Sequence, residues 1–180
     1  MRITGGEWAS RRVRGPGRGN AVRPTPDALR EQAFAILVPR LAGATFLDLF
    51  AGTGIVTLEA LSRGASRSIA VEASQRVAAL LRSNLALLEG APERCQVIVR
   101  PALAAVEALA AAGVRCPLAW CDPPFSHWQD GVAALLLARE RGVLKADATV
   151  VLEVPTPRTT VPAGFELVRR LKGAFVLACA

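Results

Sequence analysis

The most informative short motif of this chain is Asp122-Pro123-Pro124-Phe125. Two consecutive prolines cannot continue a strand ladder, and they fix the backbone, so the Asp122 side chain and a neighbouring backbone carbonyl present acceptors to one spot. Phe125 offers a ring face for a flat base. Acceptors on the N–H bonds of an exocyclic base amine orient its nitrogen and stabilise the charge that grows as a methyl group arrives. The motif therefore indicates chemistry at a nucleobase amine; the alternative is a proline-rich turn with a buried Phe125.

A second candidate site is the glycine loop that runs from Asp48 to Gly54 with the sequence DLFAGTG. Gly52 and Gly54 let the backbone approach a ligand closely, and the loop leads into a helix N-terminus. Thr57 stands where a dinucleotide fingerprint has its third glycine, which counts against a pyrophosphate site. Glu72 follows the next expected strand, where a carboxylate can accept hydrogen bonds from both ribose hydroxyls. The alternatives are that the two glycines only form a tight turn and that Glu72 is an ordinary loop acid.

The positive charge of the chain is concentrated near its start. The 180 residues contain 22 Lys and Arg against 15 Asp and Glu, for a net charge of +7. Residues 1–23 hold six Arg and one Glu, a local +5, which leaves +2 for the rest. A basic arm of this kind can follow nucleic-acid phosphates without reading sequence; a solvated tail is the alternative. The arm's candidate RNA-binding residues are Arg11, Arg12, Arg14 and Arg18.

Composition excludes several classes of protein and of site. A hydrophobic share of 52% with 21% charged residues is typical of a globular chain. The apolar runs are too short for a membrane span, and the first 20 residues lack the apolar core of a secretory signal. We therefore expect a cytoplasmic protein. Four Cys without a C-x-x-C pair, together with a single His, offer no plausible zinc set, so no metal is expected.

The candidate residues need a framework, and strand and helix patterns alternate from residue 45 onward. Such alternation predicts a doubly wound, mostly parallel α/β sheet with helices on both faces, with the last two strands adding an antiparallel edge. Ligands then bind beyond the carboxyl ends of the strands. Strands are expected at 45–50, 68–71, 96–99, 118–121, 149–154, 165–171 and 174–179. Helices are expected at 56–63, 74–88, 103–111 and 130–139, and one more between a Thr25 cap and Pro39. Segments 2–4 and 12–14 are expected to pair as a small hairpin.

Five motifs, in order and spacing, resemble the RsmD family of S-adenosylmethionine-dependent methyltransferases. They are residues 1–6 (MRITGG), 23–25 (RPT) with Arg30-Glu31, 48–54, 58–64 (LEALSRG) and 122–125. The resemblance covers nearly the whole chain. It implies a Rossmann-like class I methyltransferase domain with seven strands over 23–180, preceded by a basic N-terminal extension over 1–22. It also implies transfer of a methyl group to N2 of a guanine in 16S ribosomal RNA.

The resemblance further implies how S-adenosylmethionine is held. Gly52 and Gly54 would pass under its methionine part, Asp48 would lie near its amino group, and Glu72 would hold its ribose. The sequence departs from the family at Arg100-Pro101-Ala102, where an acid or Asn usually contacts the adenine. Adenine binding must therefore depend on other groups.

The target end of the site follows from the same resemblance. Arg23 and Thr25 would close over the cofactor and the guanine. Asp122 and the Pro123 carbonyl would bind the target amine, and Phe125 would stack on the base.

The expected partner is 16S ribosomal RNA, either naked or within an assembling small ribosomal subunit, and the expected state is a monomer without membrane contact. Three alternatives stay open on the sequence. The same motif serves adenine-N6 methyltransferases of DNA or RNA. A nicotinamide-dependent oxidoreductase is disfavoured by Thr57 and by the lack of a proton-donor set. A non-catalytic RNA-binding module of the same fold is the third.

Overall fold

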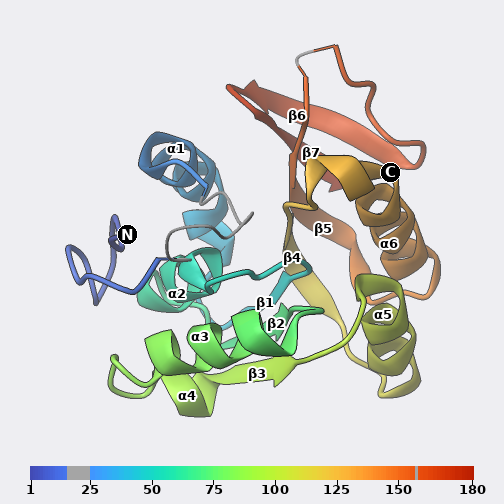
Figure 1. Cartoon of the computed structure of the whole chain (residues 1–180). Helices are drawn as coiled ribbons and strands as arrows, with labels where there is room; N and C mark the ends of the chain where they lie inside the picture. Colours follow the sequence, from blue (N-terminus) through green and yellow to red (C-terminus); the bar gives the residue numbers. More distant parts are fainter. Residues whose placement is uncertain (16–24, 157) are drawn as a thin grey trace.

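The computed structural model describes residues 1–15, 25–156 and 158–180. Its centre is one seven-stranded sheet with the order β3-β2-β1-β4-β5-β7-β6 (Figure 1). The strands are β1 (Thr45–Asp48), β2 (Arg67–Val71), β3 (Cys95–Ile98), β4 (Cys116–Cys121), β5 (Leu144–Glu153), β6 (Phe165–Leu171) and β7 (Ala174–Cys179). The pairs among the first five strands are parallel, and β7 is antiparallel to both β5 and β6. The expected fold class is confirmed.

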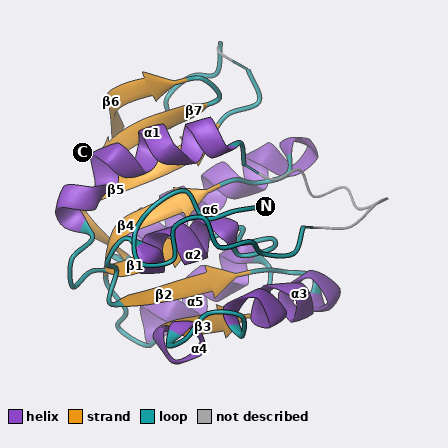
Figure 2. Ribbon diagram, turned by 90° about the vertical axis from the view of Figure 1, so that its left-hand side faces the viewer, coloured by secondary structure: helices purple, strands orange, loops and turns teal. Residues whose placement is uncertain are grey.

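Helices cover both faces of this sheet (Figure 2). The helices are α1 (Asp27–Leu37), α2 (Ile55–Ser62), α3 (Gln75–Leu85), α4 (Ala91–Arg94), α5 (Ala102–Ala111) and α6 (Trp128–Glu140), with 3₁₀ turns η1 (Val38–Arg40) and η2 (Phe125–His127). Apolar side chains of α1, α2 and α3 share one buried cluster, and those of α5 and α6 share another on the opposite face. This two-sided burial explains why the central strands are continuous apolar runs.

The strand order reverses between β1 and β4, because β1 pairs with β2 on one side and with β4 on the other. The segments that follow these two strands run to opposite faces of the sheet, which leaves a crevice between them. Asp48 ends β1, and Asp122 follows β4 directly. The topology therefore brings the two predicted chemical motifs, 74 residues apart in number, to one crevice.

The first 15 residues pack against α2, and the expected hairpin is reduced to one antiparallel bridge between Arg2 and Arg12. Ile3 and Trp8 are buried in the cluster that also contains α2. The backbone N–H of Trp8 donates to Ser62 Oγ at 2.8 Å. Gly6 has φ +83°, and a Cβ there would lie 1.9 Å from the Ser62 carbonyl oxygen, so the close approach requires glycine. Backbone hydrogen bonds from Ile3 N to Arg11 O and from Val13 N to Met1 O, both 3.0 Å, flank this bridge, so the segment is held by this short pairing and by its contacts with α2. The expected boundary at residue 22 lies outside the described residues.

Among the boundaries that differ from expectation are those of α1, β5 and α3. Pro26, not Thr25, precedes the first residue of α1, and the Thr25 hydroxyl binds Glu153 instead. β5 begins at Leu144, five residues earlier than expected, because Leu144 pairs with Cys116 of β4. The sequence does not predict this start, because Lys145 and the two residues that follow it are exposed and interrupt the apolar run. The third helix begins after Ser74, whose side chain accepts from Val77 N, and ends at Leu85 rather than residue 88.

No helix in the described parts of the chain has the length and apolar character that a membrane crossing requires.

Candidate active site

A cavity of about 1280 Å³ opens at the carboxyl ends of the parallel strands. Typical small-molecule sites measure roughly 300–1,000 Å³, so this one has room for a nucleoside-sized cofactor and a base together. The predicted site residues that line it are Thr25, Asp48, Gly52, Glu72, Asp122, Pro123 and Phe125. The structure thus brings together residues from four segments of the chain. Arg23 and Arg18 lie outside the described residues.

The glycine loop is shaped by two left-handed residues, Gly52 with φ 53° and Gly54 with φ 85°. Gly52 lies at the cavity, and its N–H donates to Glu72 Oε2 at 3.1 Å. Gly54 is not a lining residue; a Cβ there would lie 2.9 Å from Leu81 Cγ of α3. Gly52 can therefore meet a ligand, whereas Gly54 allows the turn to pack on a neighbouring helix.

Glu72 follows β2 at the cavity wall, and its two oxygens are held by backbone donors. Gly52 N binds Oε2, and Ser74 N binds Oε1 at 2.7 Å. Each carboxylate oxygen has a second lone pair, so hydroxyls of a ribose can still be accepted. The carboxylate is thus preorganised at the place that a ribose role requires.

Asp48 is almost completely buried at the end of β1, and Thr57 of α2 donates to its Oδ2 at 2.7 Å. Burial raises the pKa of Asp48 to about 7, while the hydrogen bonds from Thr57 and the Phe50 backbone act to lower it and Glu72 acts to raise it. The threonine that breaks the dinucleotide fingerprint is therefore a partner of Asp48. Sequence reasoning noted its identity but missed this contact.

The Asp122-Pro123-Pro124-Phe125 turn leaves β4 and leads into η2. Pro123 packs so closely on α6 that a Cβ at Gly131 would lie 2.4 Å from Pro123 Cγ. Phe125 lines the cavity and is 53% exposed, so the reading of a proline-rich turn with a buried Phe is wrong. An exposed ring at the mouth of a cavity is available for stacking.

The Asp122 carboxyl has three acidic or polar neighbours. Burial raises its pKa to about 8, helped by the charges of Glu153 and Asp48 and by a hydrogen bond with Glu153, while a hydrogen bond with Thr25 lowers it. A carboxyl with a pKa near neutrality, in a cleft and beside another carboxyl, is typical of functional sites. Asp122 is therefore a candidate for the chemical role that the sequence predicts for it.

Glu153, at the end of β5, is the main site residue that sequence reasoning missed. It lines the cavity and is 7% exposed. Its Oε1 accepts from Thr25 Oγ1 at 2.8 Å and from Trp120 Nε1 at 3.2 Å. The available signal was positional, because Glu153 ends a buried strand as Asp48 does.

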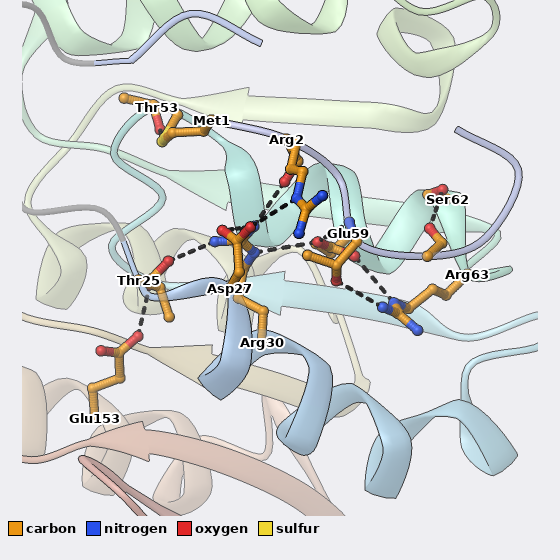
Figure 3. A network of polar contacts seen from close by, with 12 residues as sticks. Met1, Arg2, Thr25, Asp27, Arg30, Thr53, Glu59, Ser62, Arg63 and Glu153 are labelled. Carbon is orange, nitrogen blue, oxygen red and sulfur yellow. Dashed lines mark hydrogen bonds and ion pairs between the residues drawn. The ribbon is translucent and has the colours of Figure 1, made fainter. Parts of the chain in front are cut away.

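A buried ion-pair network connects this region to the first residues of the chain (Figure 3). Arg30, 1% exposed, donates through Nε to Glu59 Oε1 at 3.2 Å, and through Nη1 to the Thr25 carbonyl. Its Nη2 donates to the Arg2 carbonyl at 2.7 Å. Glu59 also accepts from Thr4 N at 2.6 Å. The guanidinium thus fixes both the entrance to α1 and the N-terminal segment.

The predicted RNA-binding residues Arg11, Arg12 and Arg14 are exposed. The Arg14 backbone is held by buried Asn84, which accepts from Arg14 N at 2.9 Å and donates to Arg14 O at 3.0 Å. The same Asn84 amide donates to the Thr53 carbonyl of the glycine loop at 2.9 Å. This end of the basic segment is therefore anchored beside the loop.

Arg100, Pro101 and Ala102, where the resemblance places the adenine, line the cavity together with Ala73 and Leu103. These groups supply apolar walls and one guanidinium. In the described part of the chain, no group of three or more potential metal ligands comes together.

Comparison with known proteins finds similarity over nearly the whole chain. The family model described as conserved hypothetical protein 95 matches residues 1–178. "Ribosomal RNA small subunit methyltransferase D" of Escherichia coli strain K12 is 35% identical over 173 residues, which cover 94% of this chain and 83% of the relative.

Two solved structures extend the comparison. A hypothetical protein of Thermus thermophilus superimposes with a TM-score of 0.81 at 29% identity, covering 100% of this chain and 99% of the other. An O-methyltransferase from Bacillus cereus in complex with SAH shares the fold, with a TM-score of 0.69 at 13% identity over 87% of this chain and 82% of that one. The match to the family model over nearly the whole chain, with a relative 35% identical over 94% of it, is decisive: the chain belongs to the RsmD family.

Proposed function

We propose that this protein transfers a methyl group from S-adenosylmethionine to N2 of a guanine in 16S ribosomal RNA. The observation that carries the proposal is the meeting of Asp122, Pro123 and Phe125 with Gly52 and Glu72 in one cavity. The names of the relatives support the reaction class and the ribosomal RNA substrate.

The cavity fits the cofactor at three places. Glu72 is fixed by two backbone donors where a ribose can bind. Asp48, buried at the end of β1, would bind the cationic amino group in the methionine part of the cofactor. Gly52 offers a backbone surface without a side chain between these two carboxyls. S-adenosylmethionine supplies an electrophilic methyl group on a sulfonium sulfur.

The target amine requires acceptors, because its lone pair is delocalised into the base and makes the nitrogen a poor nucleophile. Asp122 Oδ and the Pro123 carbonyl would accept hydrogen bonds from the two N–H groups of guanine N2. These hydrogen bonds would turn the nitrogen toward the methyl group. As the new N–C bond forms, the S–CH3 bond of the sulfonium would break and S-adenosylhomocysteine would leave. Positive charge grows on the nitrogen, and the two acceptors stabilise it. The nitrogen would then lose one proton to Asp122 or to water. Phe125 would hold the base plane by stacking.

The basic residues complete the substrate side. Arg11, Arg12 and Arg14 lie exposed on a segment anchored beside the glycine loop. They would contact phosphates and position the RNA, whereas the cavity selects the base. Residues 1–22 would then act as the RNA-positioning extension, and residues 23–180 as the methyltransferase domain.

The experiment is methylation of 16S RNA, both naked and within small-subunit particles, with isotopically labelled S-adenosylmethionine. Nuclease digestion and mass spectrometry then identify the labelled nucleoside. We expect N2-methylguanosine at one position. Labelled N6-methyladenosine would assign the chain to the adenine class, and RNA binding without label would assign it to the non-catalytic class.

A further inference from the structure

Glu153 lies beside Asp122 because the two strands that carry them are neighbours. Cys121 of β4 pairs with Leu152 of β5, so the residues that follow stand next to each other at the carboxyl edge of the sheet. Glu153 is 7% exposed and lines the cavity. A carboxylate in this place needs partners, because burying an unpaired charge is costly.

The partners of Glu153 come from three different segments. Trp120 Nε1 of β4 and Thr25 Oγ1, just before α1, both donate to Glu153 Oε1, at 3.2 and 2.8 Å; Figure 3 shows the Thr25 contact. Trp128 Nε1 of α6 donates to the Glu153 backbone carbonyl at 3.3 Å. The Thr25 hydroxyl and the Glu153 carboxyl both act on the pKa of Asp122, the first lowering it and the second raising it. The Glu153 carboxyl is therefore fixed on one side by donors and acts on Asp122 on the other.

We propose that Glu153 is a positioning residue for methyl transfer: it shares one proton with the Asp122 carboxyl, which orients that carboxyl toward the target amine, and transfer follows once this proton has left the pair. This inference rests on the proposed function. Glu153 touches neither the base nor the cofactor in this role; it acts through Asp122.

The ionisation of Asp122 matters because a carboxylate accepts a hydrogen bond more strongly than a neutral carboxyl. Burial, then Glu153, then Asp48 raise the pKa of Asp122 to about 8. Below that pH the pair retains a proton, and the acceptor for the amine is weakened. The transfer rate should therefore rise with pH up to about 8.

Other titratable groups face the same cavity and must be separated from this pair. They are Asp48 from β1, Glu72 after β2, Arg100 after β3, Lys172 between β6 and β7, and the His127–Asp130 pair, whose Nδ1 and Oδ2 lie 3.3 Å apart. Asp48, with a pKa of about 7, titrates in the same range but would act on cofactor binding. Single-turnover rates at saturating S-adenosylmethionine isolate the step in which Asp122 acts.

Two isosteric substitutions change the pair in opposite directions. Glu153→Gln replaces the charge with an amide, which no longer repels ionised Asp122. Thr25→Val removes the hydroxyl whose hydrogen bond lowers the pKa of Asp122. Glu140→Gln, an exposed change at the end of α6, is the matched control.

The test is the single-turnover rate of each variant on 16S RNA between about pH 5.5 and 9. We expect the wild-type rate to rise through an apparent pKa near 8. Glu153→Gln should move that apparent pKa down by about one unit or more, because the neutral amide does not repel ionised Asp122. Thr25→Val should move it up, and Glu140→Gln should follow the wild type.

The outcomes distinguish this inference from the function on which it rests. If the wild type transfers the methyl group and the pH profile of Glu153→Gln superimposes on the wild-type profile, the positioning role is overturned and the proposed function remains intact. Absence of transfer to RNA by the wild type at every pH overturns both. Melting temperatures identify any variant that fails to fold, and an unmoved Thr25→Val profile would then contradict the inference independently.

Discussion

At the scale of single residues, the site consists of carboxylates at strand ends whose surroundings give them different properties. Glu72 is held by backbone N–H donors at 2.7 and 3.1 Å. Asp48 and Asp122 are desolvated, and burial is the first cause of the raised pKa of each. The fold thus gives one carboxylate fixed by backbone donors and two buried carboxyls whose pKa values are raised to about 7 and about 8.

Glu72→Ala should weaken S-adenosylmethionine binding by about 1.5–3 kcal/mol, the contribution of hydrogen bonds to a charged group. Isothermal titration calorimetry measures this, and RNA affinity without cofactor should barely change. Glu89→Ala, an exposed glutamate before α4, is the control. Unchanged cofactor affinity in Glu72→Ala would remove Glu72 from the ribose role.

Asp122→Asn should stabilise the fold more at pH 8 than near pH 4. The pKa of Asp122 is raised from 3.8 to about 8 in the folded state. Between these values the folded state holds a proton that the unfolded state releases, so this group's contribution to stability is lost as pH rises to about 8. The neutral amide avoids that loss. Thermal unfolding should show the larger rise in melting temperature at pH 8, with 1 kcal/mol equivalent to roughly 2–4 °C. Equal rises at both pH values would contradict the desolvated state of this carboxyl.

At the scale of elements, α2 is the support of the site. All eight of its residues are buried, and its polar members each have a partner: Thr57 binds Asp48, Ser62 binds the Gly5 carbonyl, and Glu59 binds Arg30. The helix therefore joins the first strand to the N-terminal segment. Its burial on all sides depends on residues 1–15 covering its outer face.

Glu59→Gln should destabilise the fold by about 3 kcal/mol, near the lower end of the cost of breaking a buried ion pair. The change leaves the buried Arg30 guanidinium with the half-exposed Asp27 as its remaining charged partner. Chemical denaturation measures the change in the free energy of unfolding. Glu166→Gln on the exposed part of β6 is the matched control and should change stability by less than about 0.5 kcal/mol. A similar small effect for Glu59→Gln would mean that the network contributes no more than an exposed pair.

The elements also show where sequence reasoning succeeds and where it fails. The last two strands have the bounds that the sequence predicts, because Lys172-Gly173 separates two clear strand patterns. The crevice residues Asp48 and Asp122 follow from strand ends alone. The start of β5 is missed because strand pairing outweighs three exposed residues. Glu153 and Arg30 are missed because their partners, Thr25 and Glu59, are distant in sequence and only the tertiary fold brings them together.

At the scale of the whole molecule, charge and cavity are arranged for a large anionic substrate. Arg11, Arg12 and Arg14 are exposed on a segment whose end is bound through Asn84 to the glycine loop. Anchoring limits the number of orientations from which a bound RNA could present a base. Under the proposed function, phosphate contacts by these arginines would lie beside the cavity that selects the base.

Replacing Arg11, Arg12, Arg14 and Arg18 by Gln should reduce the salt dependence of RNA binding. For every arginine–phosphate interaction that the substitution removes, the slope of log K against log salt should fall by about 0.7–0.9. Binding isotherms from low to physiological salt measure the slope, with cofactor affinity as the internal control. Identical slopes for wild type and variant would mean that these arginines do not touch RNA and that its phosphates bind elsewhere.

The central claim is that Asp122 holds the guanine amine during methyl transfer. The direct measurement is the single-turnover rate of labelled methyl transfer to 16S RNA by Asp122→Ala, at saturating S-adenosylmethionine. We predict a fall of roughly 10²-fold or more, as for loss of one preorganised partner of a transition state, with the fold and most of the cofactor affinity retained. A rate within a few-fold of the wild type, with the label still recovered as N2-methylguanosine, would contradict the claim.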